Sequence, residues 1–209
     1  MREPSVCWST PRRPGALAAA GRTRADVRVR PVVLVASTGD ELVADGSTLA
    51  RGQIHESNSA VLAAALARDG AEPVTGPPLR DRAEELSEWL DRNAGDADLV
   101  ILTGGASVGA YDVVKEVLSR LGTVQFDKVA MQPGMPQGFG TIGPDATPVF
   151  GLPGNPVSAL VSFEAFVRPA LRKMLGTTPL ERPRVRAVAS TVLRAPAGKV
   201  AFLRVLLEV

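Results

Sequence analysis

Short apolar runs alternate with amphipathic stretches along the middle of the chain. The runs Val32–Ala36 and Leu99–Leu102 are continuously apolar, which predicts strands that are buried on both faces of a sheet. Between them, apolar residues recur three and four positions apart, the spacing of a helix with one buried face. These positions are Val61, Leu62, Ala65 and Leu66 in one stretch, and Leu86, Trp89 and Leu90 in the next.

Turn and capping residues indicate where these elements begin and end. Ser57 precedes the first helical stretch as a candidate N-cap, and Gly70 is well placed to end it. A second strand is predicted at Glu72–Thr75. Asp81, with Glu84 three residues later, resembles a capping box at the start of the second helix.

The alternation of strands and helices continues as far as residue 175. Further predicted elements are a helix at Val113–Leu121, strands at Thr123–Met131 and Pro148–Leu152, and a long helix at Val157–Leu175 followed by Gly176. Strands separated by helices require right-handed crossovers and a parallel sheet covered on both faces. The sequence therefore predicts an α/β domain with a doubly wound, mostly parallel sheet over residues 30–177.

Both ends of the chain depart from this pattern. Residues 1–29 are rich in Arg and Pro, and we interpret them as a leader or the remnant of an upstream domain. Residues 178–209 change to β-like alternation at Val185–Val192 and Val200–Val209, on either side of a turn at Pro196-Ala197-Gly198. Two strands are too few for an independent domain, so we expect the start of a C-terminal β-rich domain.

Composition narrows the classes of function. With 209 residues, 45% of them hydrophobic, the chain can bury one substantial core, and no apolar run approaches the roughly 20 residues of a membrane span. Although the pI is near 9.0, residues 1–30 hold seven arginines and two acids, so the remainder is net negative, which argues against a nucleic-acid partner. The single cysteine and single histidine, Cys7 and His55, exclude an internal disulfide and a His/Cys zinc site. We therefore expect a cytoplasmic protein without membrane or nucleic-acid partners, in which any metal is a hard ion held by oxygen.

The segment Thr103–Asp112 is the clearest sign of a ligand site. It follows the predicted strand at Leu99–Leu102 and precedes a predicted helix. Its three glycines and its serine permit a tight turn with free backbone N–H groups, and the helix adds the positive end of its dipole, so an anion is the expected ligand. Asp112 would place a carboxylate, and with it a metal ion, beside that anion.

Three other loops are expected to meet this segment. They are Ser37–Glu41, Gln132–Pro136 and Leu152–Ser158. In open α/β sheets, ligands bind beyond the carboxyl ends of the strands, where these loops are predicted to lie. Ser158, in the first turn of a helix after a proline-rich loop, is well placed to bind a phosphate.

Together the four segments resemble the molybdopterin molybdenumtransferase family, which includes MoeA and the gephyrin E domain. The stretches that carry the resemblance are Ser37-Thr-Gly-Asp-Glu-Leu42, Thr103-Gly-Gly-x-Ser-x-Gly-x-x-Asp112, Pro133-Gly-x-Pro136 and Leu152-Pro-Gly-Asn-Pro-Val-Ser158. The match runs from about Pro14 to Leu175 and, weakly, to the C-terminus. The fold that it implies is the MogA/MoeA molybdopterin-binding fold.

The resemblance implies an enzyme of molybdenum cofactor biosynthesis that inserts molybdate into adenylylated molybdopterin and releases AMP, with Mg²⁺ as the metal. It implies Asp112 and Asp81 as catalytic carboxylates, and Asp40, Glu41 and Asp112 as metal ligands. The residues expected to bind substrate are Thr103, Gly104, Gly105, Ser107, Gly109, Pro133, Gly134, Pro153, Gly154, Asn155 and Ser158. Members of the family act as homodimers, and a molybdopterin adenylyltransferase is the candidate protein partner.

The chain departs from the family at two points. The loop Gln132–Pro136, the third of the four in chain order, usually reads Lys-Pro-Gly-Lys-Pro in the family. Gln132 and Met135 stand at the two lysine positions here. Glutamine donates hydrogen bonds but cannot neutralise an oxyanion, and methionine offers an anion almost nothing. The family also carries two further upstream domains and a complete downstream β-domain. These departures leave open a non-catalytic molybdopterin-binding and dimerisation module. The related adenylyltransferase, which shares the fold and also binds molybdopterin, is a second alternative, and the Leu152–Ser158 stretch together with Asp40-Glu41-Leu42 argues against it.

Several candidate residues also have a purely structural interpretation. Asp81 can serve as a helix cap, and Asp112 can stabilise a helix dipole. Asp40 and Glu41 can simply end a strand in solvent, and Ser158 can cap a helix without touching a ligand.

Overall fold

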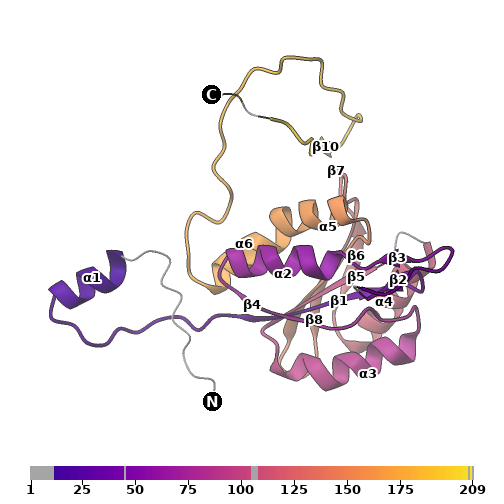
Figure 1. The fold of residues 1–209 in the computed structure, drawn as a ribbon, viewed down its shortest axis with the longest axis horizontal. Helices are drawn as coiled ribbons and strands as arrows, with labels where there is room; N and C mark the ends of the chain where they lie inside the picture. Colours follow the sequence, from indigo (N-terminus) through magenta and orange to yellow (C-terminus); the bar gives the residue numbers. More distant parts are fainter. Residues whose placement is uncertain (1–11, 45, 105–107, 207, 209) are drawn as a thin grey trace.

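The apolar runs form a six-stranded sheet in the order β4-β1-β5-β9-β8-β6, with helices on both faces (Figure 1). This computed structural model describes residues 12–44, 46–104, 108–206 and 208. The strands are β1 (Val32–Thr38), β4 (Glu72–Thr75), β5 (Leu99–Gly104), β6 (Gln125–Lys128), β8 (Pro136–Ile142) and β9 (Thr147–Leu152). Strands β4, β1, β5 and β9 are mutually parallel, and β8 runs antiparallel to both of its neighbours, β9 and β6.

Two helical layers cover the sheet, one on each face (Figure 1). One layer consists of α2 (Asn58–Arg68), α5 (Pro156–Ser162), the π-helical turn η2 (Phe163–Val167) and α6 (Arg168–Met174); the other consists of α3 (Ala83–Asn93), η1 (Ala94–Asp96) and α4 (Val108–Leu121). Because side chains alternate along a strand, Val33 and Val35 pack against the first layer, whereas Leu34 and Ala36 pack against the second. The predicted doubly wound α/β fold is confirmed.

The strand order reverses between β1 and β5. From β1 the chain passes through α2 to β4 on one side, and then through α3 to β5 on the other. A ligand crevice is expected outside the carboxyl ends of two such strands. At this end Ser37 pairs with Thr103, and Thr38 pairs with Gly104. These four residues, predicted in loops, therefore lie in strands, because the backbone pairing of β1 and β5 continues past their apolar runs.

Strand β8 is absent from the prediction because its sequence lacks a strand pattern. It begins with Pro136 and contains Gly138 and Gly140, which weaken any propensity for a strand. The glycines are needed for packing, since a Cβ on Gly138 would lie 2.5 Å from Cε1 of Phe126. The strand predicted at Thr123–Met131 was too long: it is divided into β6 and a short strand β7 (Met131–Gln132).

Helix bounds agree with the prediction except at their starts and at one internal turn. Ser57 stands at the N-cap of α2 without a side-chain capping bond, and Oε1 of Glu56 instead accepts the N–H of Ser59 at 2.9 Å. The predicted helix at Val157–Leu175 is continuous but contains the π-helical turn, and Gly176 follows it with φ +62°.

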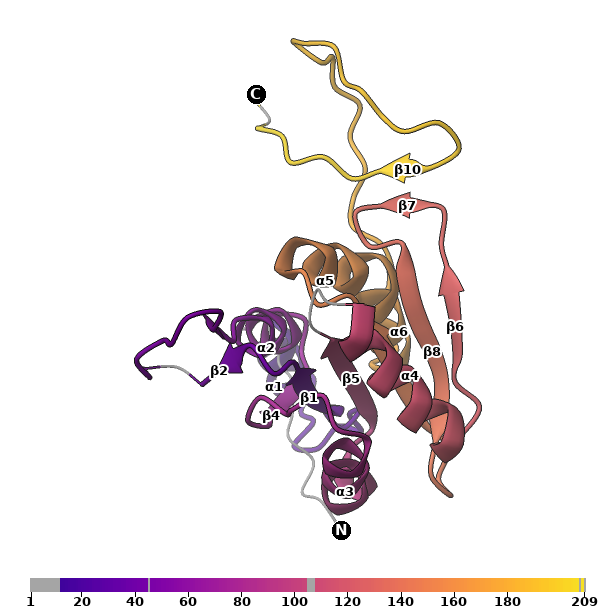
Figure 2. The same ribbon diagram turned by 90° about the vertical axis from the view of Figure 1, so that its right-hand side faces the viewer.

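The remaining elements are short and lie away from the central sheet. Strand β2 (Leu42–Val43) pairs with β3 (Ile54–His55), and helix α1 (Arg12–Ala19) falls within the region interpreted as a leader. Strand β10 (Val200–Ala201) pairs in parallel with β7 (Figure 2). Among the described residues no helix is long and apolar enough to cross a membrane.

The strand predicted at Val185–Val192 is not formed, and the strand predicted at Val200–Val209 is reduced to β10. The predicted turn is present, with Gly198 at φ +73°. The side chains of Val188 and Val192 are 97% and 88% exposed, so the described chain offers their apolar faces nothing to pack against. Alternation alone was misleading because a strand also needs a paired neighbour.

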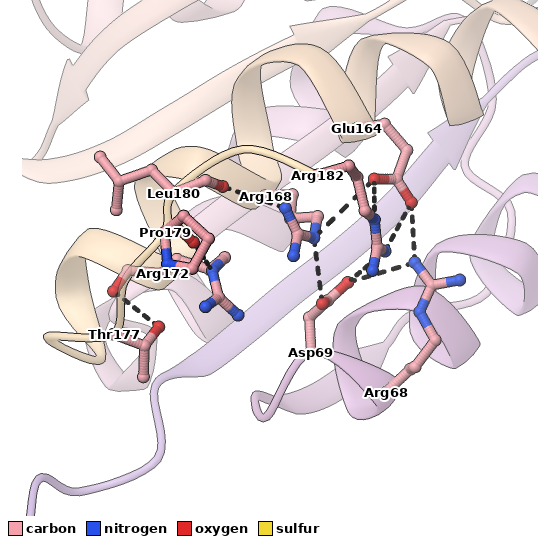
Figure 3. A network of polar contacts seen from close by, with 9 residues as sticks. All are labelled: Arg68, Asp69, Glu164, Arg168, Arg172, Thr177, Pro179, Leu180 and Arg182. Atoms are coloured by element: carbon pink, nitrogen blue, oxygen red, sulfur yellow. Dashed lines mark hydrogen bonds and ion pairs between the residues drawn. The ribbon is translucent and has the colours of Figure 1, made fainter. Parts of the chain in front are cut away.

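A cluster of ionised side chains joins α2 to the helical segment at the end of the domain (Figure 3). Nε of Arg168 lies 3.1 Å from Oδ1 of Asp69, and each of these side chains is only 6% exposed. Arg182 and Arg68 contact Oε1 of Glu164 at 2.9 and 2.7 Å. Burial alone would raise the pKa of Glu164, but hydrogen bonds from Arg182 and Arg68 outweigh burial and lower it below its ordinary value.

Arginines of this cluster and the neighbouring Arg172 hold the segment that leaves the domain after α6. Arg168 donates to the backbone oxygen of Leu180 at 3.0 Å, and Arg172 donates to that of Pro179 at 2.6 Å (Figure 3). Arg182 follows directly and enters the ion cluster, contacting Asp69 at 3.3 Å. Residues 179–182 are therefore anchored to the domain at three points.

Candidate functional site

The four loops predicted to converge lie at one edge of the sheet (Figure 2). Strands β1, β5 and β9 are parallel neighbours, so the loops that follow them share the carboxyl edge. Strand β8 runs antiparallel to β9, so the loop Gln132–Pro136 before it lies at the same edge. Gly134, with φ +92°, packs closely on α5: a Cβ there would lie 2.9 Å from Oγ of Ser162. The strand topology therefore places the described parts of these loops at one edge of the sheet.

A chain of buried hydrogen bonds runs across this edge. Ser37 Oγ donates to Oε1 of Glu56 at 2.7 Å and lies 2.8 Å from Oγ1 of Thr103. Because the Ser37 hydrogen is directed to the carboxylate, Thr103 donates to Ser37. Asn58 Nδ2 in turn donates to Thr103 Oγ1 at 3.3 Å and to the backbone oxygen of Gly154 at 2.7 Å. The chain links β1, β5, α2 and the loop after β9.

The sequence analysis named Ser37, Thr103 and Gly154 as members of the motif loops, but it missed Glu56, Asn58 and the hydrogen bonds that join them. Glu56 and Asn58 flank a predicted N-cap, where polar residues are ordinary, and Gly154 lies 96 residues from Asn58. Only the tertiary structure brings them together. Thr103, predicted to bind substrate, is fully buried and engaged with Ser37 and Asn58.

The loop Leu152–Ser158 is fixed by its own cap. The side chain of Asn155 accepts the N–H groups of Val157 and Ser158 at 3.1 and 3.2 Å, and Ser158 Oγ lies 3.4 Å from the same oxygen. Asn155 therefore serves as the N-cap of α5, with Pro156 at its first position. The backbone N–H groups of Val157 and Ser158, which could otherwise bind a phosphate, are thus hydrogen-bonded within the loop. Asn155, and not Ser158, caps the helix.

Three carboxylates lie beside the end of β1. The backbone N–H of Asp81 donates to Oδ1 of Asp40 at 3.3 Å. Burial raises the pKa of Asp81, and the negative charges of Asp40 and Glu41 raise it further, against the opposing effects of the backbone bond and the nearby Thr38 hydroxyl. Oδ1 of Asp81 and Oγ1 of Thr38 are both buried, and apart from the interaction between these two side chains neither oxygen has a hydrogen-bond partner in the described structure. These oxygens are available to a ligand.

The capping-box interpretation of Asp81 is wrong. Helix α3 has Arg82 at its N-cap in an extended conformation, with no side-chain capping bond. The preceding segment instead continues along the end of β1: Leu79 donates to the Ser37 carbonyl at 2.9 Å, and Gly39 donates to the Leu79 carbonyl at 3.0 Å. This pairing draws Asp81 away from the helix start and toward Asp40.

A cavity of about 570 Å³ opens beside these carboxylates. Its lining includes Gly39, Asp40, Ser47, Gln53, Arg80 and Arg82. Arg80 and Arg82 in its lining would provide positive charge for an anionic ligand. Sequence reasoning missed both arginines, because isolated basic residues in a loop form no pattern.

The metal site predicted at Asp40, Glu41 and Asp112 is not formed by described side chains alone. Among them, no group of three or more His, Cys, Asp or Glu residues is arranged to hold a metal ion. Gly105 and Ser107 lie outside the described residues. Gly109 and Asp112 belong to the first turns of α4 by their backbone, and the side chain of Asp112 is also outside the described part of the structure.

The third loop receives a cation from the C-terminal segment. Val200 N–H donates to the Ala130 carbonyl at 2.9 Å, and Phe202 N–H donates to the Gln132 carbonyl at 2.8 Å. This pairing places Nζ of Lys199 3.7 Å from Sδ of Met135. A lysine distant in sequence thus reaches the loop in which Gln132 and Met135 replace the family's lysines.

Comparison with known proteins gives one coherent set of similarities. Residues 34–173 match the family model of a probable molybdopterin binding domain. The chain is 48% identical over 205 residues to molybdopterin molybdenumtransferase 2 of Mycobacterium tuberculosis, covering 95% of this chain and 50% of that protein. It is 41% identical over 191 residues to molybdopterin molybdenumtransferase 1 of the same organism, and this match covers 91% of this chain and 45% of that protein.

The fold comparison points the same way. The crystal structure of the molybdopterin biosynthesis protein MoeA from Pyrococcus horikoshii aligns with a TM-score of 0.71 at 36% identity, covering 79% of this chain and 40% of that one. The chain spans about half the length of the curated relatives it matches.

Proposed function

The chain belongs to the molybdopterin-binding domain family, and from this premise we propose that it forms the pterin-binding part of a molybdopterin molybdenumtransferase. Such an enzyme inserts molybdate into adenylylated molybdopterin and releases AMP. The observation that carries the proposal is the 48% identity to a molybdenumtransferase over 95% of this chain. The position of the motif loops at one edge of the sheet, beginning where the strand order reverses between β1 and β5, supports it.

The carboxylates beside β1 give this proposal a chemical basis. Asp81 and Asp112 would face the pyrophosphate of the substrate, and Asp40 and Glu41 would lie next to them. The buried oxygens of Asp81 and Thr38 are hard donors, which suit Mg²⁺ rather than zinc. Because the described side chains do not complete a metal site, Mg²⁺ would also need Asp112 or phosphate oxygens. When bound, it would neutralise charge on the phosphates.

The substrate would lie along the loops of the carboxyl edge. We propose that the backbone of Gly104, Gly105, Ser107 and Gly109 holds a phosphate, with Thr103 behind it. The remaining proposed contacts are Pro133, Gly134, Pro153, Gly154, Asn155 and Ser158. Homodimer formation, a cytoplasmic location and a molybdopterin adenylyltransferase partner belong to the same proposal.

Gln132 and Met135 favour a second candidate function. Without lysines at these positions, the third loop binds an oxyanion more weakly. A module that binds molybdopterin without inserting molybdenum would fit that change. Lys199 beside Met135 counts against it, because it returns a positive charge to the loop.

The decisive experiment measures molybdate-dependent release of AMP from adenylylated molybdopterin. It uses the chain itself, the same chain joined to the upstream and downstream domains of a relative, and Asp81→Asn in both. Asp91→Asn, which alters an exposed residue of α3, is the matched control. We expect the joined protein to release AMP, with release lost in Asp81→Asn and kept in the control. Binding without release by the joined protein would support the binding module, and absence of binding would refute both functions.

A further inference from the structure

Asn58 joins two loops of the candidate site with one side chain. It is the first residue of α2 and is only 7% exposed. Its Nδ2 donates to the carbonyl of Gly154, in the loop after β9, at 2.7 Å, and to the hydroxyl of Thr103, at the end of β5, at 3.3 Å. Because only the NH₂ group can donate to a carbonyl, the Gly154 bond fixes the orientation of the amide.

The link continues beyond Thr103 to a charged group. Thr103 donates to Ser37, and Ser37 donates to Oε1 of Glu56, which also accepts the N–H of Ser59. Ser37 and Thr103 are 1% and 0% exposed. Successive bonds in a buried chain polarise one another, so a change at one end alters the geometry at the other. Asn58 is the member that connects this chain to the loop after β9.

The amide oxygen of Asn58 indicates a role beyond stability. Oδ1 of Asn58 is buried without a hydrogen-bond partner among the described residues. An unpaired buried acceptor destabilises a folded protein, so folding alone does not account for this oxygen. Oγ1 of Thr38, at the end of β1, is likewise buried with no hydrogen-bond partner other than Asp81 among the described residues, and Asn58 itself contacts the end of β5 and the loop at Gly154. A ligand or a water held with the ligand would satisfy Oδ1 of Asn58.

We infer that Asn58 is a positioning residue for the phosphorylated pterin, because it sets the separation between the end of β5 and the loop at Gly154. This inference rests on the proposed function. It predicts that affinity depends on a hydrogen-bond donor at position 58. An aspartate there is nearly isosteric but faces two acceptors. Ionised, it would repel the Gly154 carbonyl; protonated, it would restore one donated bond.

The test is the pH dependence of binding of adenylylated molybdopterin to Asn58→Asp, measured by calorimetric titration between pH 5 and pH 8. At pH 8 we expect the dissociation constant to rise at least tenfold over that of the unaltered chain. At pH 5 it should return to within about threefold. Circular dichroism at both pH values verifies that the variant is folded.

Asn93→Asp is the matched control. Nδ2 of Asn93 also donates to a backbone carbonyl at 2.7 Å, that of Trp89, within α3. This substitution alters a side-chain-to-carbonyl bond of the same length at an exposed position at the end of α3, so it should leave the affinity unchanged at both pH values. Thr103→Val breaks the same chain without adding a titratable group and should weaken binding equally at pH 5 and pH 8. It also serves if Asn58→Asp fails to fold.

The outcomes separate the inference from the function on which it rests. Wild-type affinity of folded Asn58→Asp at pH 8, or a pH profile equal to that of Asn93→Asp, overturns the positioning role alone. Unchanged affinity in Thr103→Val does the same. Failure of both the unaltered chain and the joined protein to bind adenylylated molybdopterin overturns the proposed function, and the inference with it.

Discussion

Replacement of Asp69 by asparagine should remove a large share of the stability of the domain. The substitution keeps the shape of the side chain but removes the charge that faces Arg168, and both side chains are 6% exposed. Loss of one partner of a buried ion pair costs about 3–5 kcal/mol, because the other charge stays buried. Arg168 retains Leu180 as an acceptor at 3.0 Å and Glu164 at 3.8 Å. We therefore expect Asp69→Asn to lower the free energy of unfolding by about 3 kcal/mol, the lower end of this range.

Urea unfolding followed by circular dichroism measures this loss directly. For a chain of this size, about 3 kcal/mol corresponds to a fall in melting temperature of roughly 6–12 °C. A double-mutant cycle with Arg168→Met should give a coupling energy of at least about 1 kcal/mol, since the two side chains are in contact. The coupling energy isolates the interaction between Asp69 and Arg168 from the other effects of each single substitution.

An exposed ion pair provides the comparison. Arg92 and Glu88 lie 3.3 Å apart on α3, with side chains 70% and 72% exposed. Glu88→Gln should cost less than about 0.5 kcal/mol, because water and salt screen such a pair. If Asp69→Asn costs no more than Glu88→Gln, or if the cycle gives no coupling, burial does not govern this cluster and the reasoning is refuted.

Three further predictions concern the site and its pH dependence. Lys199→Met should raise the molybdate concentration needed for half-maximal AMP release in the joined protein, whereas Lys173→Met on α6 should not; equal curves would exclude a role for Lys199. Asp81→Asn should stabilise the domain at pH 7 but not at pH 3. Because the pKa of Asp81 is raised in the folded protein, the stability that the protonated carboxyl gives the domain below the ordinary value of 3.8 is lost as pH rises through the folded pKa. If the urea midpoints of Asp81→Asn and of the unaltered chain do not diverge as pH rises, this reasoning is contradicted. Glu164 has a lowered pKa, so the stability that it contributes above its ordinary value of 4.5 is lost as pH falls through its folded pKa. Glu164→Gln should flatten the urea midpoint over that range, and an unchanged slope would argue against it.

The sequence predicted the centre of the fold because that part is buried on both faces. Strands β1 and β5 are continuous apolar runs, and the helices between them carry one apolar face. Strand β8 has no such signature, since Gly138 and Gly140 are selected by the close approach of β6 and the segment before it. The C-terminal alternation was genuine as a pattern, but a strand forms only where a neighbour pairs with it.

The candidate site was predictable in its loops but not in its connections. The motif loops could be placed at one edge by strand order alone. The role of Asp81 could not, because its spacing to Glu84 satisfies a capping box while the backbone is drawn along β1. Asn58 was hidden for a similar reason, since an asparagine at a helix start needs no tertiary partner to explain it. Lys199 reaches Met135 only through the pairing of β10 with β7.

We expect the ion cluster around Asp69 to influence how often Lys199 contacts the loop Gln132–Pro136. The chain from Arg182 to Lys199 is held at one end by the cluster and at the other by β10 (Figures 2 and 3). A tether of this kind gives its far end an effective local concentration of about millimolar order. Releasing the anchored end lengthens the tether and lowers that concentration. Because Leu180, Pro179 and Glu164 still hold the segment when Asp69 alone is replaced, replacement of Asp69 together with Glu164 should weaken anion binding, and only in a protein that still carries Lys199.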